Sequence, residues 1–545
     1  MTTTIYKSSI PPIEVFQGSL PELMLQSPNY KGRENLPLMT DAQSGKTLTI
    51  ADHFKLVRAF TALFKQYGLQ RDDVVALYVP NNIYLPAVHQ GILSAGGTIS
   101  PINSAYPVQD VRDQIESAGA KYAIAFDGNS MLKTVTDATA ALQVRVVPFS
   151  KLVAEALSTK AGEGPAGDHL PLVKPAKDTL AYLCFSSGTT GGFKGVMTSH
   201  MNMNANIMQS ILADSVIYSP NAVYSAFLPM THIYGLNLHI YCTVYMGAQN
   251  IVMPAFDFEL FLKSVVKYQM SHVYLVPPIM VLLAKSPLVD KYPEITESLK
   301  FLFSGAAPLS TTLAMAVTKR LKSRIIVCQG YGMTETSPVV TMTFHYRPDS
   351  KIGSVGQLVP NCEARLIDLE TGKDAPPQGT GELLVRGPNV MMGYLNNDVA
   401  NAETLIGDGW LRTGDVAHVD DDGYWYIVDR YKEMIKSKGF QVAPAELEAL
   451  LLAHPHVVDA AVIGHWSEEE ATEHPRAFVV LVPNGDAEQV KKWIDEQVAK
   501  HKRLWGGIVV VDQIPKSPSG KILRRFLKDR KDDIVVGVKS LVAKL

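Results

Sequence analysis

The stretch Phe185-Ser-Ser-Gly-Thr-Thr-Gly-Gly-Phe-Lys-Gly195 decides how the whole sequence is interpreted. It follows an apolar, strand-like run at residues 180–185 and precedes a helix that we expect from about Asn202. Its glycines let the backbone turn sharply and point several N–H groups at one anion. The glycines are Gly188, Gly191, Gly192 and Gly195, the hydroxyl donors are Ser186, Ser187, Thr189 and Thr190, and the positive charge is Lys194. This combination predicts a site for a polyphosphate.

The loop differs from a Walker phosphate loop, because Phe193 precedes Lys194 and Gly195 follows it, where a Walker loop has Gly and then Ser or Thr. The alternative is a polar Gly/Ser turn in a linker. Linkers of that composition rarely lie between a buried strand and a helix while carrying a single lysine. We therefore interpret the stretch as a phosphate loop.

Upstream of the loop, strand-like and helix-like segments alternate. Residues 74–79 are a short, continuously apolar run closed by Pro80, which is typical of a strand buried on both faces. Helix-like segments at residues 51–64, 85–93 and 107–118 and further strands at 98–102 and 122–126 complete the alternation. Strands separated by amphipathic helices predict βαβ units around a mainly parallel sheet, so the expected fold class is α/β.

The pattern of residue types changes twice towards the C-terminus. From about residue 350, frequent glycines separate short apolar runs such as residues 382–386, which predicts a small barrel or sheet. Residues 430–545 then show a compact α+β pattern, with a helix from Pro444, strands at 457–463 and 477–482, and a helix at 487–501. We therefore expect an N-terminal domain of residues 1–429, with a β-rich subdomain at about 350–429, and a C-terminal domain of residues 430–545.

Composition excludes several classes of protein. The 545 residues are 46% hydrophobic and carry a net charge of −2, which excludes a mainly disordered chain and argues against a nucleic-acid-binding function. The four cysteines, Cys184, Cys242, Cys328 and Cys362, are far apart, so we expect reduced thiols and neither a disulfide framework nor a zinc site. The longest apolar run, residues 273–284, is too short for a transmembrane segment and contains Pro277 and Pro278.

The two ends of the sequence differ in what they predict. The N-terminal residues lack the basic and then apolar pattern of a secretory signal. The last three residues, Ala543-Lys544-Leu545, are one substitution from the S-K-L peroxisomal address, which predicts recognition by the peroxisomal import receptor. The alternative is a chance tripeptide on a cytoplasmic protein.

The phosphate loop resembles the S-S-G-T-T-G-x-x-K-G signature of the acyl-adenylate-forming superfamily, and further motifs match in the expected order. The overall sequence pattern is most similar to that of 4-coumarate:CoA ligases and the peroxisomal acyl-CoA ligases related to them. The resemblance implies a large N-terminal domain of αβ-layered subdomains plus a small β-barrel, followed by a small, mobile α+β C-terminal domain. One departure is Gly192-Phe193, where many relatives have Leu-Pro.

The resemblance assigns a nucleotide site. Gln329-Gly-Tyr-Gly-Met-Thr-Glu335 is similar to the family's adenine and phosphate segment. Gly330 and Gly332 would let the backbone approach the adenine, Tyr331 would stack on it, Thr334 would donate to the α-phosphate, and Glu335 would bind Mg²⁺. Asp415, in Trp410-Leu-Arg-Thr-Gly-Asp415, and Arg430 resemble the residues that contact the ribose of ATP.

The resemblance also assigns catalytic residues. Lys521, in a loop rich in Pro, Ser and Gly, matches the lysine that bridges the substrate carboxylate and the α-phosphate. His232 resembles the histidine between the acyl pocket and the thiol tunnel. Lys436, Lys438, Gly439 and Gln441 match the loop that lines the pantetheine channel of coenzyme A, with Lys436 also a candidate catalytic residue. A rotation about Lys432, the expected hinge, would exchange this loop for Lys521 between two half-reactions.

The acyl pocket implied by the resemblance is small and apolar. The residues expected around it are Tyr234, Gly305, Ala306, Gly330, Pro338, Val339 and Val340. They suit an aryl-propenoate or an alkyl chain, and none of them is an acid that would bind the ammonium group of an amino acid.

The predicted function is therefore a carboxylic acid:CoA ligase that uses ATP, Mg²⁺ and coenzyme A and releases AMP and pyrophosphate. Its substrate would be an aryl-propenoic acid of the 4-coumarate kind or a medium- or long-chain fatty acid. Two alternatives stay open at this point. One is a luciferase-like monooxygenase that uses the same adenylation step, and the other is a relative that binds nucleotide and acid without turnover.

Overall fold

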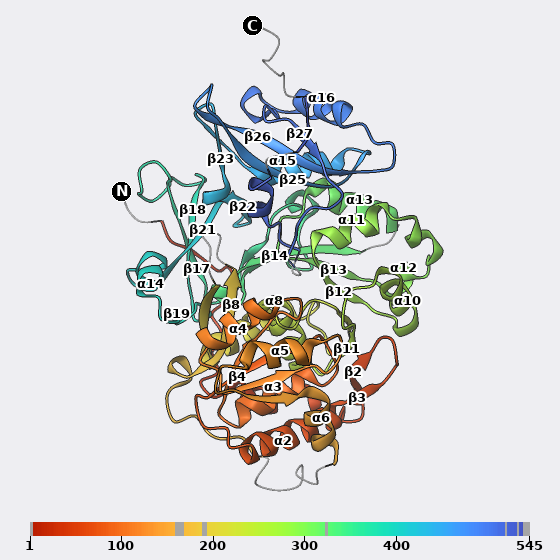
Figure 1. Cartoon of the computed structure of the whole chain (residues 1–545), viewed down its shortest axis with the longest axis vertical. Helices are drawn as coiled ribbons and strands as arrows, with labels where there is room; N and C mark the ends of the chain where they lie inside the picture. The colour runs from red at the N-terminus through yellow and green to blue at the C-terminus, as the bar shows by residue number, and fades with distance from the viewer. Residues whose placement is uncertain are drawn as a thin grey trace.

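A computed structural model describes residues 4–158, 168–187, 193–321, 325–517, 520–530 and 533–537. The glycine-rich centre of the phosphate loop, residues 188–192, and the tail Ala543-Lys544-Leu545 lie outside the described residues. Figure 1 shows a large N-terminal domain, coloured from red to teal, and a smaller C-terminal domain in blue that lies against one end of it. The predicted α/β fold class with a large and a small domain is confirmed.

The first layer of the large domain is a seven-stranded sheet in the order β19-β9-β8-β5-β4-β6-β7. Its strands are β4 (Val74–Tyr78), β5 (Thr98–Pro101), β6 (Tyr122–Ala125), β7 (Arg145–Pro148), β8 (Leu180–Ser187), β9 (Phe193–Ser199) and β19 (Gly393–Tyr394). The helices that alternate with them are α2 (Ile50–Gln66), α3 (Leu85–Ser94), α4 (Val108–Ser117), α5 (Met131–Thr139) and α6 (Phe149–Ser158). All five residues of β4 are buried and its pairs with β5 and β6 are parallel, as the apolar run closed by Pro80 predicted.

The second layer is a nine-stranded sheet in the order β16-β15-β14-β13-β12-β10-β11-β2-β3. Its strands are β2 (Pro37–Asp41), β3 (Thr47–Thr49), β10 (Val223–Ala226), β11 (Gln249–Val252), β12 (His272–Leu275), β13 (Phe301–Ser304), β14 (Ile326–Gly332), β15 (Val339–Met342) and β16 (Gln357–Leu358). The helices that accompany it are α1 (Leu20–Leu25), α7 (His200–Ala213), α8 (Ile233–Gly235), the π-helix Leu236–Cys242, α9 (Thr243–Tyr245), α10 (Phe258–Tyr268), α11 (Pro277–Lys285), α12 (Ile295–Ser298) and α13 (Thr311–Leu321). The central strands β11, β10, β12, β13 and β14 are parallel, so their carboxyl ends meet at one edge.

The glycine-rich segment after residue 350 forms a six-stranded antiparallel sheet. Its strands are β1 (Tyr6–Lys7), β17 (Glu363–Ile367), β18 (Gly381–Arg386), β20 (Leu405–Ile406), β21 (Trp410–Val419) and β22 (Trp425–Arg430), and α14 (Asp398–Thr404) lies beside them. The sheet therefore combines the N-terminal strand with residues more than 350 positions later.

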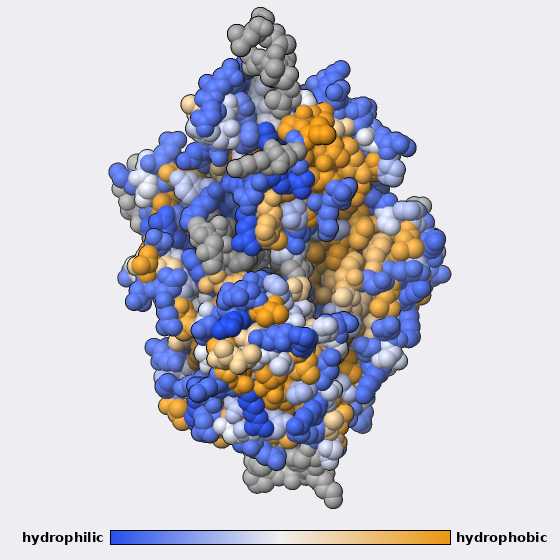
Figure 2. All heavy atoms as spheres, in the orientation of Figure 1, coloured by the Kyte–Doolittle hydropathy of each residue, from blue (hydrophilic) through white to orange (hydrophobic). Residues whose placement is uncertain are grey.

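The C-terminal domain has a core of its own, separate from that of the large domain. It contains the hairpin β23 (Ile435–Ser437) and β24 (Phe440–Val442), and the sheet β25 (Val457–Ser467), β26 (Thr472–Leu481), β27 (Ile508–Val510) and β28 (Val535–Val536). Its helices are α15 (Pro444–Ala453), α16 (Ala487–Gln497) and α17 (Arg524–Lys528). Figure 2 shows that the visible face is mainly hydrophilic, with hydrophobic surface gathered beside the junction of the two domains.

Two expected elements differ in the structure. The phosphate loop joins two antiparallel strands, β8 and β9, so a strand that the sequence did not predict lies between the loop and the helix. Helix α7, expected from about Asn202, begins at His200, because Ser199 and Asn202 form a capping box there. Helix α16 ends at Gln497, four residues before the expected end, and the side chain of Asp495 accepts the N–H of Leu504, which turns the chain back.

No helix among the described ranges is long and apolar enough to cross a membrane. Cys184, Cys242, Cys328 and Cys362 are all buried and free. Burial raises the pKa of each thiol, to about 12 for Cys184. These side chains are therefore neutral thiols packed in the cores.

Candidate active site

The site lies where the carboxyl ends of β12, β13 and β14 face the six-stranded sheet and the C-terminal domain (Figure 1). In parallel α/β sheets this edge is where ligands bind. Gly305 and Ala306 follow β13, and Gln329 and Gly330 lie in the second half of β14. Ala306 is exposed and holds φ of +67°, a left-handed conformation that is uncommon for a residue with a Cβ.

Asp415, Tyr331 and Arg430 form one cluster at this edge. The Tyr331 hydroxyl donates to Oδ2 of Asp415 at 2.6 Å, and Arg430 Nε lies 3.5 Å from Oδ1. The pairing of β21 with β22 places Asp415 directly opposite Arg430. Burial raises the pKa of Asp415, while Arg430 and Tyr331 both favour its ionised form. A buried carboxylate with this orientation is suited to accept hydrogen bonds from neighbouring hydroxyl groups, such as those of a ribose.

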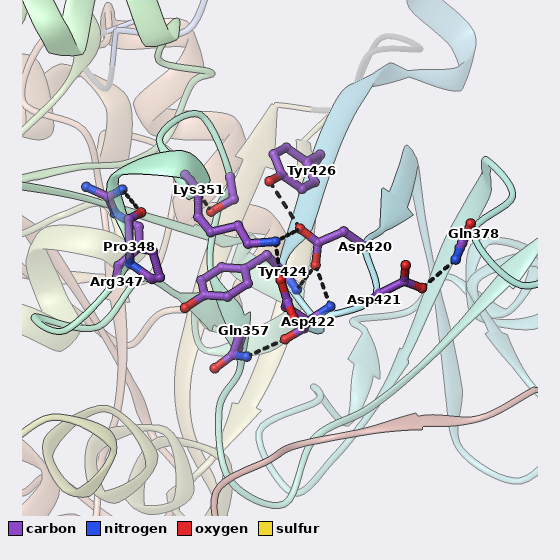
Figure 3. A network of polar contacts seen from close by, with 11 residues as sticks. Arg347, Pro348, Lys351, Gln357, Gln378, Asp420, Asp421, Asp422, Tyr424 and Tyr426 are labelled. Atoms are coloured by element: carbon purple, nitrogen blue, oxygen red, sulfur yellow. Dashed lines mark hydrogen bonds and ion pairs between the residues drawn. The ribbon is translucent and has the colours of Figure 1, made fainter.

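The far end of the β21–β22 hairpin is fixed by a second polar network (Figure 3). Lys351 Nζ lies 2.8 Å from Asp420 Oδ2 and 2.5 Å from Asp422 Oδ2, and the hydroxyl of Tyr426 also donates to Asp420. The two carboxylates raise the pKa of Lys351. These contacts tie the turn of the hairpin to the segment after β15, so Asp415 and Arg430 extend from an anchored element.

Glu335 and Lys194 are connected through Tyr394. The Tyr394 hydroxyl donates to Glu335 Oε1 at 2.8 Å, and Lys194 Nζ lies over the Tyr394 ring, 4.9 Å from its centre. Burial and the Glu335 carboxylate both raise the pKa of Tyr394, so its phenol stays protonated and donates. The motifs drew attention to Glu335 and Lys194, whereas Tyr394 was missed because it lies in a two-residue strand with no motif around it.

The described part of the phosphate loop is its two strand ends. Ser186 is paired with Lys194, and Ser187 with Phe193, across β8 and β9. This pairing places Lys194 one residue from the start of β9. The predicted residues Gly188, Thr189 and Thr190 lie outside the described residues, as do Gly191 and Gly192.

The other residues predicted to bind the nucleotide lie on β14 and the turn after it. Gln329 is buried and its side chain accepts the Leu309 N–H at 3.3 Å. Gly330 and Gly332 allow close approach, because a Cβ on Gly332 would lie 2.0 Å from the Pro338 carbonyl oxygen. Thr334 and Glu335 begin the short 3₁₀-helix Thr334–Thr336, with Glu335 buried.

Lys521 reaches this site from the C-terminal domain. Its backbone N–H donates to Ser517 Oγ at 3.2 Å, and the Ser517 N–H donates to the Lys521 carbonyl at 2.8 Å, which closes a tight turn. Gly520 holds φ of +81° and lies against Val276 at the start of α11. Burial and the charge of Arg430 lower the pKa of Lys521 to about 8, and Glu433, Asp415 and Glu335 oppose that shift. The structure thus brings Lys521 together with Arg430, Asp415 and Glu335.

His232 is the residue before α8, and its Nδ1 accepts the Tyr234 N–H at 3.3 Å. Burial, with the positive charge of Lys521 as a smaller cause, lowers the pKa of His232 to about 4. The imidazole is therefore neutral at physiological pH and lies on the side of the site that Lys521 occupies.

A small cavity lies beside His232. Its volume is about 20 Å³, which is room for about one water molecule, so the surrounding side chains would have to move apart to admit an acid. Its lining residues are Tyr218, Tyr234, Asn237, Leu238, Tyr274, Phe303, Pro338, Val339 and Met342. Asn237 and Leu238 come from the π-helix, a rare conformation that is frequent at functional sites.

The cavity contains three of the predicted acyl-pocket residues, Tyr234, Pro338 and Val339. Gly305 lies against it, because a Cβ there would be 3.2 Å from the Tyr234 ring, and a Cβ on Gly330 would be 2.9 Å from the Phe303 ring. Ala306 and Val340 do not line it. The rings of Tyr218, Tyr274 and Phe303 were missed, because they lie in apolar segments whose periodicity predicts ordinary core.

The candidate coenzyme A residues lie elsewhere. Lys436, Lys438, Gly439 and Gln441 are all exposed on or between β23 and β24. Lys438 is held away from the nucleotide site by an ion pair with Glu470 at 2.7 Å and by the Trp505 ring. Lys432 is exposed in the 3₁₀-helix Tyr431–Glu433, which joins the last strand of the large domain to β23.

One group of contacts joins the C-terminal domain to the large domain, and a second fixes the segment after Lys521 within it. Lys285, at the end of α11, donates to the carbonyl oxygens of Leu452 at 2.8 Å and Val457 at 2.9 Å in the C-terminal domain. Arg524, three residues after Lys521, pairs with Glu433 beside Lys432 and with Glu448 of α15. The Lys521 turn is therefore connected to the linker as well as to the large domain.

The donor set fits a magnesium ion that is held mainly by phosphates. Among the described residues no three His, Cys, Asp or Glu side chains are grouped to hold a metal. Glu335 is a buried hard oxygen ligand beside Lys194, and Mg²⁺ is commonly bound by one or two carboxylates plus substrate phosphates.

Comparisons with known proteins agree with this geometry. The family described as AMP-binding enzyme matches residues 28–395, and the AMP-binding enzyme C-terminal domain matches residues 446–521. A probable 4-coumarate–CoA ligase of Dictyostelium discoideum is 36% identical over 96% of this chain and 98% of its own length. ATP-bound MatB from Rhodopseudomonas palustris superposes with a TM-score of 0.82 at 26% identity, covering 93% of this chain and 98% of its own.

An o-succinylbenzoate CoA synthetase of Bacillus subtilis, in complex with ATP and magnesium ion, has the same fold, with a TM-score of 0.78 at 24% identity over 94% of this chain and the whole of its own. Both family matches follow the order of the motifs, with Lys194 and Glu335 in the first match and Lys521 in the second. The chain therefore belongs to the AMP-binding enzyme family, the acyl-adenylate-forming superfamily that its phosphate loop resembles, and it is an AMP-forming acid–thiol ligase.

Proposed function

We propose that the protein is a Mg²⁺- and ATP-dependent ligase that joins an aromatic carboxylic acid, such as an aryl-propenoic acid, to coenzyme A. The observation that carries the choice of acid is the aromatic lining of the cavity beside His232. Four of its nine lining residues carry aromatic rings, which suit a flat aryl group better than a long alkyl chain. The name of the Dictyostelium relative, a probable 4-coumarate–CoA ligase, supports the same class of acid.

The first half-reaction would use the cluster around Lys521. A carboxylate oxygen of the acid attacks the α-phosphorus of ATP, the bond to the pyrophosphate oxygen breaks, and an acyl-AMP forms. The two reactants are both anions, so the Lys521 cation between them lowers the cost of their approach. Asp415 and Tyr331 would fix the ribose, and Lys194 would hold the leaving phosphates. A magnesium ion on Glu335 would neutralise phosphate charge.

The second half-reaction would use the cavity again. The thiol of coenzyme A attacks the acyl carbonyl, the bond to AMP breaks, and the thiol proton leaves to solvent or to a nearby base. His232 has a pKa of about 4 and is therefore neutral, so it could form a hydrogen bond on the cavity side of the site. Lys436, Lys438, Gly439 and Gln441 would reach the channel only after the C-terminal domain rotates about Lys432.

The experiment is a thioester assay by mass spectrometry with ATP, Mg²⁺, coenzyme A and a panel of cinnamic, benzoic and fatty acids. We expect acyl-CoA from aromatic acids at a kcat/KM at least tenfold above that for fatty acids of eight or more carbons. A preference for fatty acids would contradict the choice of acid. Light emission with luciferin but no thioester from any acid would favour a luciferase-like monooxygenase, and pyrophosphate exchange independent of any acid would favour a protein without turnover.

A further inference from the structure

Lys194 and Glu335 belong to different sheets of the large domain. Lys194 lies on β9 of the seven-stranded sheet, and Glu335 lies in the turn between β14 and β15 of the nine-stranded sheet. In the proposed first half-reaction both residues would act on the phosphates of one ATP, Lys194 directly and Glu335 through magnesium. Their spacing must therefore be fixed, because a misplacement of about 1 Å can cost about a hundredfold in rate.

Residues 389–395 are hydrogen-bonded to the strand that carries Lys194. The N–H of Leu395 donates to the carbonyl oxygen of Gly195 at 2.8 Å, and Gly195 directly follows Lys194 in the chain. The pairing of β19 with β9 continues this contact along the strand. The ring of Tyr394 lies against the Lys194 ammonium.

The same segment is hydrogen-bonded to Glu335. The N–H of Met391 donates to the backbone carbonyl oxygen of Glu335 at 2.9 Å, and the Tyr394 hydroxyl donates to its carboxylate at 2.8 Å. One short segment therefore contacts both charged residues. Its position determines how far apart the two charges lie.

The side chain of Asn389 joins the segment to the turn that follows β14. Its Nδ2 donates to the carbonyl oxygens of Thr336 at 2.9 Å and Val339 at 3.0 Å. Its Oδ1 accepts the thiol of Cys362 at 3.2 Å, and burial raises the pKa of that thiol, so it stays protonated and donates. Asn389 is fully buried, and a Cβ on Gly387 would lie 2.7 Å from its Oδ1. The amide is therefore fixed in orientation and in place.

Asn202 of α7 holds the same segment through a second amide. Its Nδ2 donates to the carbonyl oxygens of Pro388 and Val390, both at 2.8 Å. Its Oδ1 accepts the Ser199 N–H at 2.8 Å in the helix cap. The donors of Asn202 thus serve the segment, and its acceptor serves the helix.

We propose that Asn389 is a positioning residue that sets the spacing between Glu335 and Lys194 and thereby the affinity for the phosphates of MgATP. Without its amide, the buried carbonyl oxygens of Thr336 and Val339 each lose a donor, and the turn is free to shift. The inference rests on the proposed roles of Glu335 and Lys194 and goes beyond them, because Asn389 is fully buried and acts only through the turn.

The test measures nucleotide binding by isothermal titration calorimetry without acid or coenzyme A, so that no turnover takes place. The two probes are MgATP and AMP. AMP lacks the β- and γ-phosphates and reports the part of the site that does not use Glu335 and Lys194. We expect Asn389→Leu to weaken MgATP binding at least about tenfold and to change AMP binding less than about threefold.

The matched control is Asn204→Leu. Asn204 is also fully buried, and its Nδ2 also donates to two backbone carbonyl oxygens, those of Phe16 at 3.1 Å and Gly18 at 2.8 Å. We expect both dissociation constants of this variant to match the wild type. If Asn389→Leu does not fold, Asn202→Asp decides by the same criterion, because an aspartate keeps the helix cap and loses both amide donors.

Each outcome decides the inference. Unchanged MgATP binding in Asn389→Leu, or equal weakening of MgATP and AMP, would overturn it, because a general loosening of the fold affects both nucleotides alike. The same selective loss in Asn204→Leu would also overturn it. A selective loss in Asn389→Leu, together with a wild type that forms no acyl-CoA from any acid, would contradict the proposed function and leave the positioning role standing.

Discussion

Lys521 lies among charges that determine when it is protonated. Burial and Arg430 lower its pKa to about 8, about two and a half units below that of a free lysine. The protonated form is the one that can draw together a carboxylate and a phosphate. The cation therefore predominates below pH 8 and is lost as the pH rises through that value, whereas an unperturbed lysine would stay charged to about pH 10.

This shift predicts a pH dependence of the first half-reaction. The kcat/KM for acid-dependent pyrophosphate exchange, which reports the free enzyme, should fall about tenfold per pH unit above pH 8. Lys521→Arg should be less active than the wild type, but its activity should stay constant from pH 7 to pH 9, because a guanidinium stays charged. A descending limb at the same pH in Lys521→Arg would assign the titration to another group.

Tyr394 contacts both Lys194 of the phosphate loop and Glu335, the candidate magnesium ligand. Substitutions of Tyr394 can therefore remove one contact or both. Tyr394→Phe removes the hydrogen bond to Glu335 and keeps the ring under Lys194, and we expect about a tenfold lower kcat/KM for MgATP. Tyr394→Leu removes both contacts and should lower it further. Steady-state kinetics at varied MgATP concentration measures kcat/KM for both variants. Equal kcat/KM values for Tyr394→Phe and Tyr394→Leu would mean that the ring does not orient Lys194.

Motif spacing identified the charged residues of the site better than the neutral ones. Asp415, Arg430, Glu335 and Lys521 carry recognisable sequence contexts, and the structure brings them together. Tyr394, Tyr218 and Tyr274 have no such context. Sequence alone predicts that an aromatic residue in an apolar segment belongs to the core, and only the folded chain shows that it lines a cavity or contacts Glu335.

Single elements followed local sequence patterns closely where the pattern was strong. The run of residues 74–79 gave the buried strand β4, and Ser199 with Asn202 gave a capped helix start. The sequence predicted the phosphate loop but not the strand β9 that follows it. Residues 193–199 form β9 because they pair with β8 and β19, and cross-strand pairing of that kind is not visible in a local window.

Helix α11 provides a contact that crosses between the domains. Lys285 reaches the Leu452 carbonyl in the last turn of α15, where helix carbonyls lack intrahelical partners and the helix dipole favours a cation. The same ammonium also binds the Val457 carbonyl at the start of β25. This contact belongs to the arrangement in which Lys521 is at the nucleotide site.

Removing the contact should therefore affect one half-reaction. We predict that Lys285→Met lowers the rate of acid-dependent pyrophosphate exchange by about three- to tenfold and leaves thioester formation from supplied acyl-AMP unchanged. Lys319→Met, on the exposed face of α13, is the matched control and should change neither rate. Equal losses in both half-reactions for Lys285→Met would contradict a role specific to this arrangement.

The proposed exchange of Lys521 for the Lys436 hairpin requires a C-terminal domain that can turn as a unit. The C-terminal domain has its own core, joins the large domain through the short helix Tyr431–Glu433, and presents Lys521 while the hairpin with Lys436 and Lys438 stays exposed. The fold class and the family followed from the sequence. The arrangement of the two domains did not, because it depends on contacts such as that of Lys285 between residues far apart in the chain.

The two roles of the C-terminal domain can be separated by Lys521→Ala. We expect this variant to lose acid-dependent pyrophosphate exchange by at least a hundredfold, since the cation between two anions is absent. Thioester formation from supplied acyl-AMP should persist close to the wild-type rate. An equal loss of both reactions would contradict the exchange of Lys521 for the Lys436 hairpin between the two steps.

The central claim is that the acid is activated as an acyl-adenylate before it reaches coenzyme A. Carboxylate oxygen labelling tests this most directly. An aromatic acid carrying ¹⁸O in both carboxylate positions is converted with ATP, Mg²⁺ and coenzyme A, and the AMP and pyrophosphate are analysed by mass spectrometry. Attack of a carboxylate oxygen on the α-phosphorus predicts one ¹⁸O atom in each AMP and none in pyrophosphate. Unlabelled AMP beside labelled phosphate or pyrophosphate would contradict the account.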